Sequence, residues 1–132
     1  MAEIINGFDR ITVPCPIELR KGSTATIRRT VYLFDHDTGQ ETLMDISPTP
    51  GDVDNIVWQL FQSLDGDDPV LEKKQSIAEI DYFDDGTDGI YEFEVSAGDL
   101  EDLQIGLYTA LLTITVGGKP IEFRPYPVSL AS

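Results

Sequence analysis

A strongly apolar face alternates with a threonine-rich face along the stretch from Leu107 to Val116. Its threonines fall on odd positions, and the even positions are apolar: Tyr108, Ala110, Leu112, Ile114 and Val116. A period of two residues predicts a β-strand with one buried face. The pair Gly117-Gly118 supplies the positive φ angles of a tight hairpin turn, and the run from Ile121 to Arg124 predicts the returning strand.

Shorter runs of the same kind recur along the chain, and each ends at residues that favour turns. We predict further strands at residues 17–20, 24–34, 55–63, 76–83 and 90–95. About seven short strands separated by turns indicate an all-β fold, an antiparallel β-sandwich. The length of 132 residues suits one domain, which buries enough surface to fold without disulfides or metals.

One segment favours a helix, and the residues ahead of the first strand are expected to form an arm. Ser96 can cap one short helical turn near 97–103, where early acidic side chains suit the positive end of the helix dipole. We predict an N-terminal arm at residues 1–12 and a single β-sandwich domain at residues 13–132. The arm packs either on a neighbouring subunit or on its own sandwich, because it carries three large apolar side chains, Ile4, Ile5 and Phe8.

Two features bear on how the strands are placed in the sandwich. Arg29 interrupts the apolar face of the strand at 24–34, so this strand either reaches beyond the core or pairs Arg29 with a carboxylate. Pro125 and Pro127 remove two backbone hydrogen-bond donors. The returning strand at 121–124 is therefore expected at a sheet edge, or the chain leaves the sheet after Arg124.

The chain is strongly acidic, with 9 basic and 24 acidic residues and a formal net charge of −15. Such a field repels a phosphate backbone, which argues against nucleic acid as a partner. Between Asp65 and Asp102 there are 14 acidic residues and only two basic ones, Lys73 and Lys74. We predict one strongly negative face, which is either simply solvated or docks between copies or onto a basic partner surface.

Nothing in the pattern predicts secretion or insertion into a membrane. The first ten residues are acidic and lack an apolar h-region, and no run of about 18 apolar residues occurs. Cys15 is the only cysteine, so an intrachain disulfide is excluded, which fits a reducing cytosol. It lies between two prolines without a nearby basic residue, and we interpret it as an inert thiol rather than a nucleophile.

His36 is the main candidate for acid–base chemistry, because Asp35 and Asp37 flank it and a carboxylate can raise the pKa of a histidine. Side chains of sequence neighbours at a strand end point apart, however, and no serine or cysteine nucleophile in a recognisable setting accompanies this histidine. A histidine in a turn is the favoured interpretation.

Metal binding is the next candidate, since several turns are rich in carboxylates. The segment from Asp35 begins like a calcium loop, but its twelfth position is Ile46, where a bidentate glutamate is required. The turns at 65–68 and 84–89 contain the aspartates and glycines that tight turns use for backbone reasons. One cysteine and one histidine are too few for zinc. We therefore predict no catalytic, cofactor-binding or metal-binding residue and no enzyme activity.

A carbohydrate- or cell-surface-binding module is the alternative hypothesis. It requires exposed aromatic side chains, and the candidates are Trp58, Tyr82, Phe83 and Tyr126. Trp58 and Phe61 are candidates for a platform on which a sugar ring stacks. A tryptophan in a β-sandwich is more often part of the core.

Seven short motifs of turn and strand residues occur in a fixed order between roughly Ile17 and Ser129. They are Leu19-Arg20-Lys21-Gly22-Ser23-Thr24, Phe34-Asp35-His36-Asp37-Thr38-Gly39, Leu43-Met44-Asp45-Ile46-Ser47, Asn55-Ile56-Val57-Trp58, Asp88-Gly89-Ile90-Tyr91-Glu92-Phe93, Leu103-Gln104-Ile105-Gly106-Leu107-Tyr108 and Gly117-Gly118-Lys119-Pro120. This order resembles the immunoglobulin-like modules of tailed-phage virions. It is similar to the N-terminal domain of baseplate upper proteins and to small capsid cement proteins.

The resemblance implies an immunoglobulin-like sandwich that serves as a non-enzymatic structural protein of the virion, in the head or the tail. It implies synthesis in the host cytoplasm and binding to other virion proteins, either major capsid or tail and baseplate subunits. Copies are expected as a homo-oligomer or bound to a lattice. Binding would rest on buried surface, with the arm, the edge strands and the segment 125–128 adding area at subunit junctions.

Overall fold

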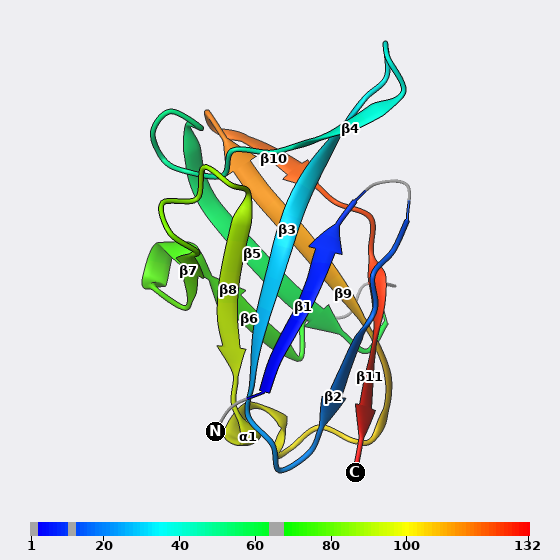
Figure 1. The fold of residues 1–132 in the computed structure, drawn as a ribbon. Helices are drawn as coiled ribbons and strands as arrows, with labels where there is room; N and C mark the ends of the chain where they lie inside the picture. The colour runs from blue at the N-terminus through cyan, green and yellow to red at the C-terminus, as the bar shows by residue number, and fades with distance from the viewer. Residues whose placement is uncertain (1–2, 11–12, 64–67) are drawn as a thin grey trace.

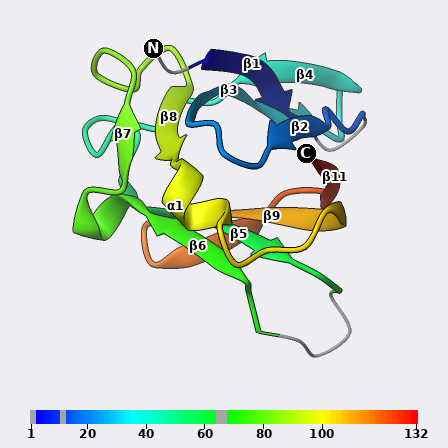
Figure 2. The ribbon, with the colours of Figure 1, turned by 90° about the horizontal axis from the view of Figure 1, so that it is seen from below.

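Two β-sheets pack face to face in the computed structural model of this chain (Figures 1 and 2). The structure describes residues 3–10, 13–63 and 68–132. Eleven strands, one short α-helix and one 3₁₀ turn occur in this part of the chain. The all-β sandwich expected from the alternating pattern is therefore confirmed, with more strands than the pattern indicated.

The sheet nearer the viewer in Figure 1, here called the front sheet, has the strand order β1-β3-β8-β7, and β4 also pairs with β3. Its strands are β1 (Glu3–Asp9), β3 (Ala25–Asp35), β4 (Gln40–Leu43), β7 (Ile80–Tyr82) and β8 (Ile90–Val95). β1 runs parallel to β3, and the other pairs of this sheet are antiparallel.

The second sheet, here called the back sheet, has the order β2-β11-β9-β5-β6, and β10 also pairs with β9. Its strands are β2 (Ile17–Arg20), β5 (Val53–Phe61), β6 (Leu71–Lys74), β9 (Gly106–Val116), β10 (Lys119–Glu122) and β11 (Tyr126–Ala131). β11 runs parallel to β2, and the remaining pairs are antiparallel. The expected antiparallel arrangement thus has two exceptions, both involving the strands nearest the N-terminus.

The core lies between the sheets, where the inward face of each strand meets the other layer. Ile27 and Phe93 from the front sheet and Trp58 and Ile114 from the back sheet belong to one continuous buried cluster. The Trp58 ring is fully buried, and its centroid lies 4.7 Å from that of Phe93. Close aromatic packing of this kind stabilises a sandwich beyond the area that it buries.

The expected helical turn is present as α1 (Ala97–Leu100). The Ser96 hydroxyl accepts a hydrogen bond from the backbone N–H of Asp99, and the Asp99 carboxylate accepts one from the N–H of Ser96. This reciprocal capping box satisfies two backbone donors at the start of the helix. Within the described residues, no helix has the length and apolar character needed to cross a membrane.

The N-terminal residues join the chain's own sandwich. β1 pairs with β3 along its whole length, from Glu3 opposite Ala25 to Asp9 opposite Val31. Ile5 packs against the core, whereas Ile4 on the opposite face of the strand is 51% exposed. The part of the expected arm that the structure describes is thus the terminal strand of the front sheet.

The strand expected at 76–83 is wrong in its bounds. β6 ends at Lys74, a 3₁₀ turn follows at Gln75–Ile77, and β7 begins at Ile80. The reason is topological, because β6 belongs to the back sheet and β7 to the front sheet. The chain crosses between the layers at this point, and Ala78 adopts a left-handed conformation with φ 62° to make the turn.

The returning strand expected at a sheet edge is β10, which pairs with β9 alone among the described strands. The prolines do not end the sheet, however, because a further strand follows them. β11 contains Pro127 and lies between β9 and β2, with Tyr126 and Val128 buried in the core. Pro127 lies opposite Thr109 of β9, and pairing with β2 begins one residue later, at Val128. Pro127, which lacks a backbone N–H, therefore lies where β11 pairs with β9 only and not yet with β2. A proline is tolerated at such a position.

Candidate functional site

The most polar part of the interior is a charged pair between β1 and β3. Arg29 and Asp9 are each 1% exposed in their side chains, and Arg29 Nε lies 3.0 Å from Asp9 Oδ1. Arg29 also donates from Nη2 to the carbonyl oxygens of Phe8 at 2.6 Å and Cys15 at 3.0 Å. The prediction that Arg29 pairs with a carboxylate is therefore confirmed.

Three aromatic side chains extend this pair into a network. The Tyr91 hydroxyl donates to Asp9 Oδ2 at 2.6 Å, and the Arg29 guanidinium lies over the Tyr126 ring, 4.1 Å from its centroid. Trp58 Nε1 in turn donates to the Tyr126 hydroxyl at 2.7 Å. Sequence reasoning missed Asp9, Tyr91 and Tyr126 as members of this network. One signal was available in the sequence. Asp9 lies an even number of residues from Ile5, so in a strand both side chains point to the same face as the core.

Burial sets the ionisation of these groups. Complete burial raises the pKa of the Asp9 carboxyl, and the Arg29 charge and the Tyr91 hydrogen bond offset part of that rise. Burial works against the charged form of Arg29, but the Asp9 carboxylate together with Tyr126, Tyr91 and Cys15 outweighs it, and the pKa of Arg29 is raised. Burial also raises the pKa of the Tyr91 and Tyr126 hydroxyls, so both stay neutral over the physiological range.

This network holds elements together and is closed to solvent. Through Arg29 it ties the end of β1 and the carbonyl of Cys15 to β3, and through Tyr126 and Trp58 it connects the front sheet to the back sheet. A substrate has no route to groups that are 0–3% exposed, as Tyr91, Asp9 and Tyr126 are. The network is therefore best explained by structure rather than by catalysis.

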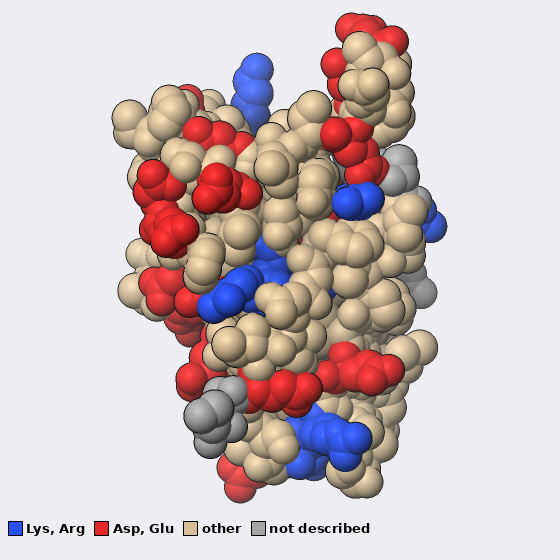
Figure 3. Space-filling view, viewed as in Figure 1, with Lys and Arg blue, Asp and Glu red and all other residues tan. Residues whose placement is uncertain are grey.

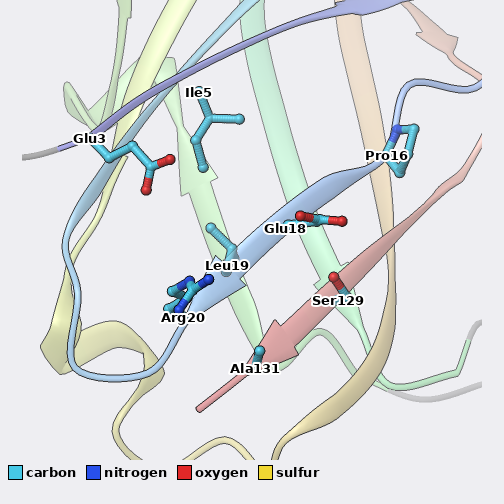
Figure 4. A pocket seen from close by; sticks show the side chains of 8 residues that line it. All are labelled: Glu3, Ile5, Pro16, Glu18, Leu19, Arg20, Ser129 and Ala131. Atoms are coloured by element: carbon cyan, nitrogen blue, oxygen red, sulfur yellow. The ribbon is translucent and has the colours of Figure 1, made fainter.

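A groove of about 570 Å³ opens where β1, β2 and β11 come together (Figure 4). Residues from β1, from β11 and from β2 with its preceding proline line it: Glu3, Ile5, Pro16, Glu18, Leu19, Arg20, Ser129 and Ala131. These side chains supply two carboxylates, one guanidinium and one hydroxyl, without a histidine or a cysteine. Such a lining suits polar contact with another molecule better than proton transfer.

His36 lies in the exposed turn between β3 and β4, at the far end of the hairpin. Its ring packs edge-on against Phe34, with the centroids 5.0 Å apart. Asp35 serves the turn itself, because its carboxylate accepts from the N–H of Asp37 at 2.8 Å and its carbonyl accepts from the N–H of Gly39. The neighbours that made His36 a catalytic candidate thus build the turn.

The acid-rich turn at 84–89 likewise uses its carboxylates for the backbone. Asp85 accepts from both the N–H and the hydroxyl of Thr87, at 3.0 Å and 2.6 Å. The hydrogen bond from the Thr87 hydroxyl is the main reason that the pKa of Asp85 is lowered. Among the described residues no group of three or more potential ligands is arranged to hold a metal ion. In the turn at 65–68, residues 65–67 lie outside the described part.

Cys15 is half-buried and close to β1. A Cβ atom placed on Gly7 would lie 3.2 Å from the Sγ atom of Cys15. The carbonyl oxygen of Cys15 accepts a hydrogen bond from Arg29. The surroundings of the thiol are thus part of the packing at the end of the buried network.

The aromatic side chains that a sugar-binding site requires do not form an exposed platform. Trp58 is 0% exposed and Tyr126 is 3% exposed. Tyr82 and Phe83 are half-buried, and the Arg28 guanidinium lies over the Phe83 ring at 4.3 Å. Phe61 is also buried.

The surface charge is uneven, as the sequence predicted. Residues 79–102 contain ten of the 24 acidic residues and no lysine or arginine. This segment forms β7, β8 and α1, and Figure 3 shows acidic side chains crowded along that side of the front sheet. Asp81 of β7 lies directly opposite Glu92 of β8, which in turn pairs with Arg28 of β3.

Comparison with known proteins adds a likeness in fold. No protein-family model matches the chain, and no curated protein sequence matches it. Among solved structures, the chain is similar to the N-terminal domain of phage TP901-1 ORF48, with a TM-score of 0.59 and 14% identity over 97% of this chain and 100% of that domain. At this identity the likeness shows the fold alone.

A second solved structure, the endo-β-1,4-mannanase from Thermotoga petrophila, matches with a TM-score of 0.49 and 15% identity over 87% of this chain. The chain spans 17% of the length of that protein. A likeness at this level carries no argument about function.

Proposed function

We propose that this chain is a non-enzymatic structural protein of a phage virion, an immunoglobulin-like module that binds other virion subunits. The observation that carries the proposal is the likeness to the N-terminal domain of phage TP901-1 ORF48, which extends over nearly the whole of this chain and the whole of that domain. The order of turn and strand motifs in the sequence points the same way.

The interior of the protein supports a role in binding rather than in catalysis. Its charged and aromatic polar groups are used to join β1, β3, β8 and the back sheet, as the contacts of Arg29, Asp9 and Tyr126 indicate. What the molecule offers to other molecules is the surface of two sheets and their terminal strands. Burial of such surface contributes about 25 cal/mol per Å² before the costs of ordering are subtracted.

The proposal is tested by reconstitution of particles that lack this chain. Heads and tails of the source phage, assembled without the chain and purified separately, are mixed with it and sedimented. We expect retention on one of the two fractions, saturating at a fixed number of copies per particle. Absence of retention on both fractions would overturn the proposal.

A matched control separates specific binding from adsorption of an unfolded chain. Trp58→Asp places a charge at a fully buried position and should prevent folding. Saturable retention of the wild-type chain together with loss of saturation in this variant supports a folded binding surface.

A further inference from the structure

The outward face of the back sheet carries few charged side chains. Over its three central strands the only one among the described residues is Asp54 at the start of β5, whose carboxylate accepts from the N–H of Gly118. The strands β5, β9 and β11 direct their outward positions to this face, and we call the set the neutral face: Asn55, Val57, Gln59, Leu107, Thr109, Leu111, Thr113, Thr115, Pro127, Ser129 and Ala131. The register places these residues in continuous rows, with Gln59 opposite Leu111 and Pro127 opposite Thr109. Leu107, at one end, is 69% exposed.

The flanking strands supply the other charged side chains around the neutral face, and these nearly cancel. Their outward positions carry three acidic and two basic residues, a net of 2 − 3 = −1: Glu18, Arg20, Glu72, Lys74 and Glu122. Lys74 and Glu72 form an ion pair with each other at 3.2 Å. With Asp54 included the net is 2 − 4 = −2, a small part of the net charge of −15 of the whole chain.

We propose that the neutral face is the surface through which two copies of this chain associate. Two molecules of charge −15 repel each other, so they approach best where each presents few acidic groups. Contact between two neutral faces around a two-fold axis stacks four sheets at about 10 Å spacing. The acidic front sheets then lie about 30 Å apart, several Debye lengths at physiological salt. This inference does not depend on the proposed virion role.

The size of the neutral face fits a weak dimer only. β9 has 11 residues, which at about 3.4 Å per residue gives a length of about 37 Å. β5 flanks β9 at residues 109–116 and β11 flanks it at residues 106–110, so about two strands at about 4.8 Å lie side by side along this length and give about 350 Å² per copy. The total of about 700 Å² is below the usual size of stable specific interfaces, so association should be transient and depend on concentration.

Sedimentation velocity of the full chain tests the proposal, with concentration and salt as the two variables. We expect monomers at low concentration and dimers as the concentration approaches the millimolar range. We also expect salt to strengthen the dimer, because screening reduces the repulsion between the two acidic molecules. A dimer held by opposite charges would instead weaken in salt.

Two variants with the same net charge locate the interface. Thr109→Glu adds an acid where β9 lies between β5 and β11, opposite Phe61 and Pro127, and should weaken dimerisation by at least about tenfold, because it brings like charges into the interface. Thr26→Glu adds the same charge at an outward position of β3 in the front sheet and should leave dimerisation nearly unchanged. Thr109→Lys reduces the net charge, yet it should also weaken the dimer, because a lysine would be buried there.

Three results would overturn the proposal. One is a wild-type chain that remains monomeric at millimolar concentration in high salt, which would leave the face to a different partner. Another is a dimer that Thr26→Glu disrupts and Thr109→Glu does not. The third is a dimer that Thr109→Lys strengthens, since net charge rather than burial of this face would then govern association. Circular dichroism of each variant establishes that it is folded.

Discussion

Gly7 and Arg29 lie opposite each other in the parallel pair of β1 and β3, and the guanidinium of Arg29 fills the space that a side chain at position 7 would occupy. A Cβ atom on Gly7 would come within 2.8 Å of Arg29 Nη1. The absence of a side chain at this position lets Arg29 reach Asp9 and the carbonyls of Phe8 and Cys15. A glycine in the middle of a strand is thus explained by close approach of a buried ion pair.

Replacement of Gly7 by alanine should destabilise the fold by about 1–3 kcal/mol, the range for overpacking. A long arginine side chain could normally move aside, but this one is held by three hydrogen-bond partners. Urea unfolding measures the change, with Asn6→Ala on the outward side of β1 as the control. Equal free energies of unfolding for the two variants would contradict this account.

Removal of the Asp9 carboxylate should cost about 3–5 kcal/mol of stability, because it leaves the Arg29 charge buried without a counterion. The double variant Asp9→Leu with Arg29→Met should cost less than the sum of the single changes, as measured by urea unfolding. Glu92→Gln serves as the matched control, because it breaks the surface pair with Arg28, where both side chains are 29% exposed. That change should cost about 0.2–1 kcal/mol. A similar loss of unfolding free energy from removal of the Asp9 carboxylate and from Glu92→Gln would contradict the claim that burial makes the Asp9–Arg29 pair more important for stability.

The capping box of α1 should give a dependence of stability on pH. Partial burial alone would raise the pKa of Asp99, but hydrogen bonds from Ser96 and the ion pair with Lys73 outweigh it, so the pKa is lowered from 3.8. A carboxyl with a lowered pKa stabilises the fold above its unfolded pKa, and this contribution is lost as the pH falls through the folded value. Asp99→Ala should therefore cost about 1 kcal/mol near neutral pH and progressively less below about pH 4.

Urea unfolding of the wild-type chain and Asp99→Ala at several pH values measures this difference. Glu101→Ala leaves the capping box intact and should change stability little across the same range. A cost of Asp99→Ala that stays constant down to low pH would show that the carboxylate charge does not contribute.

Asp81 and Glu92 are like charges directly opposite each other in the pair of β7 and β8. Asp81→Thr should stabilise the fold by about 0.2–1 kcal/mol at low salt, because it removes cross-strand repulsion and introduces a residue suited to strands. The gain should shrink as salt screens the surface charges. Glu122→Thr on β10 removes an acid opposite Thr113 and is the control. Equal gains from both variants would indicate a general effect of net charge instead.

Local pattern determined much of the fold. The alternation from Leu107 to Val116 and the turn at Gly117 predicted β9 to within one residue, because a strand with one buried face needs only a period of two. The returning strand β10 begins and ends two residues before the run expected at 121–124. Ser96 predicted the capped turn of α1 for an equally local reason, since a cap and its partner lie three residues apart.

Tertiary structure decided what depends on contacts between distant residues. The sequence indicated that Arg29 needs a carboxylate, but only the parallel pairing of β1 with β3 selects Asp9 and makes Gly7 necessary. Pro127 in an interior strand and the crossing near Ala78 follow from the way in which strands are distributed between the two sheets. The separation of an acidic front sheet from the neutral face arises in the same way, because composition sets the total charge and the pairing of strands sets where that charge lies.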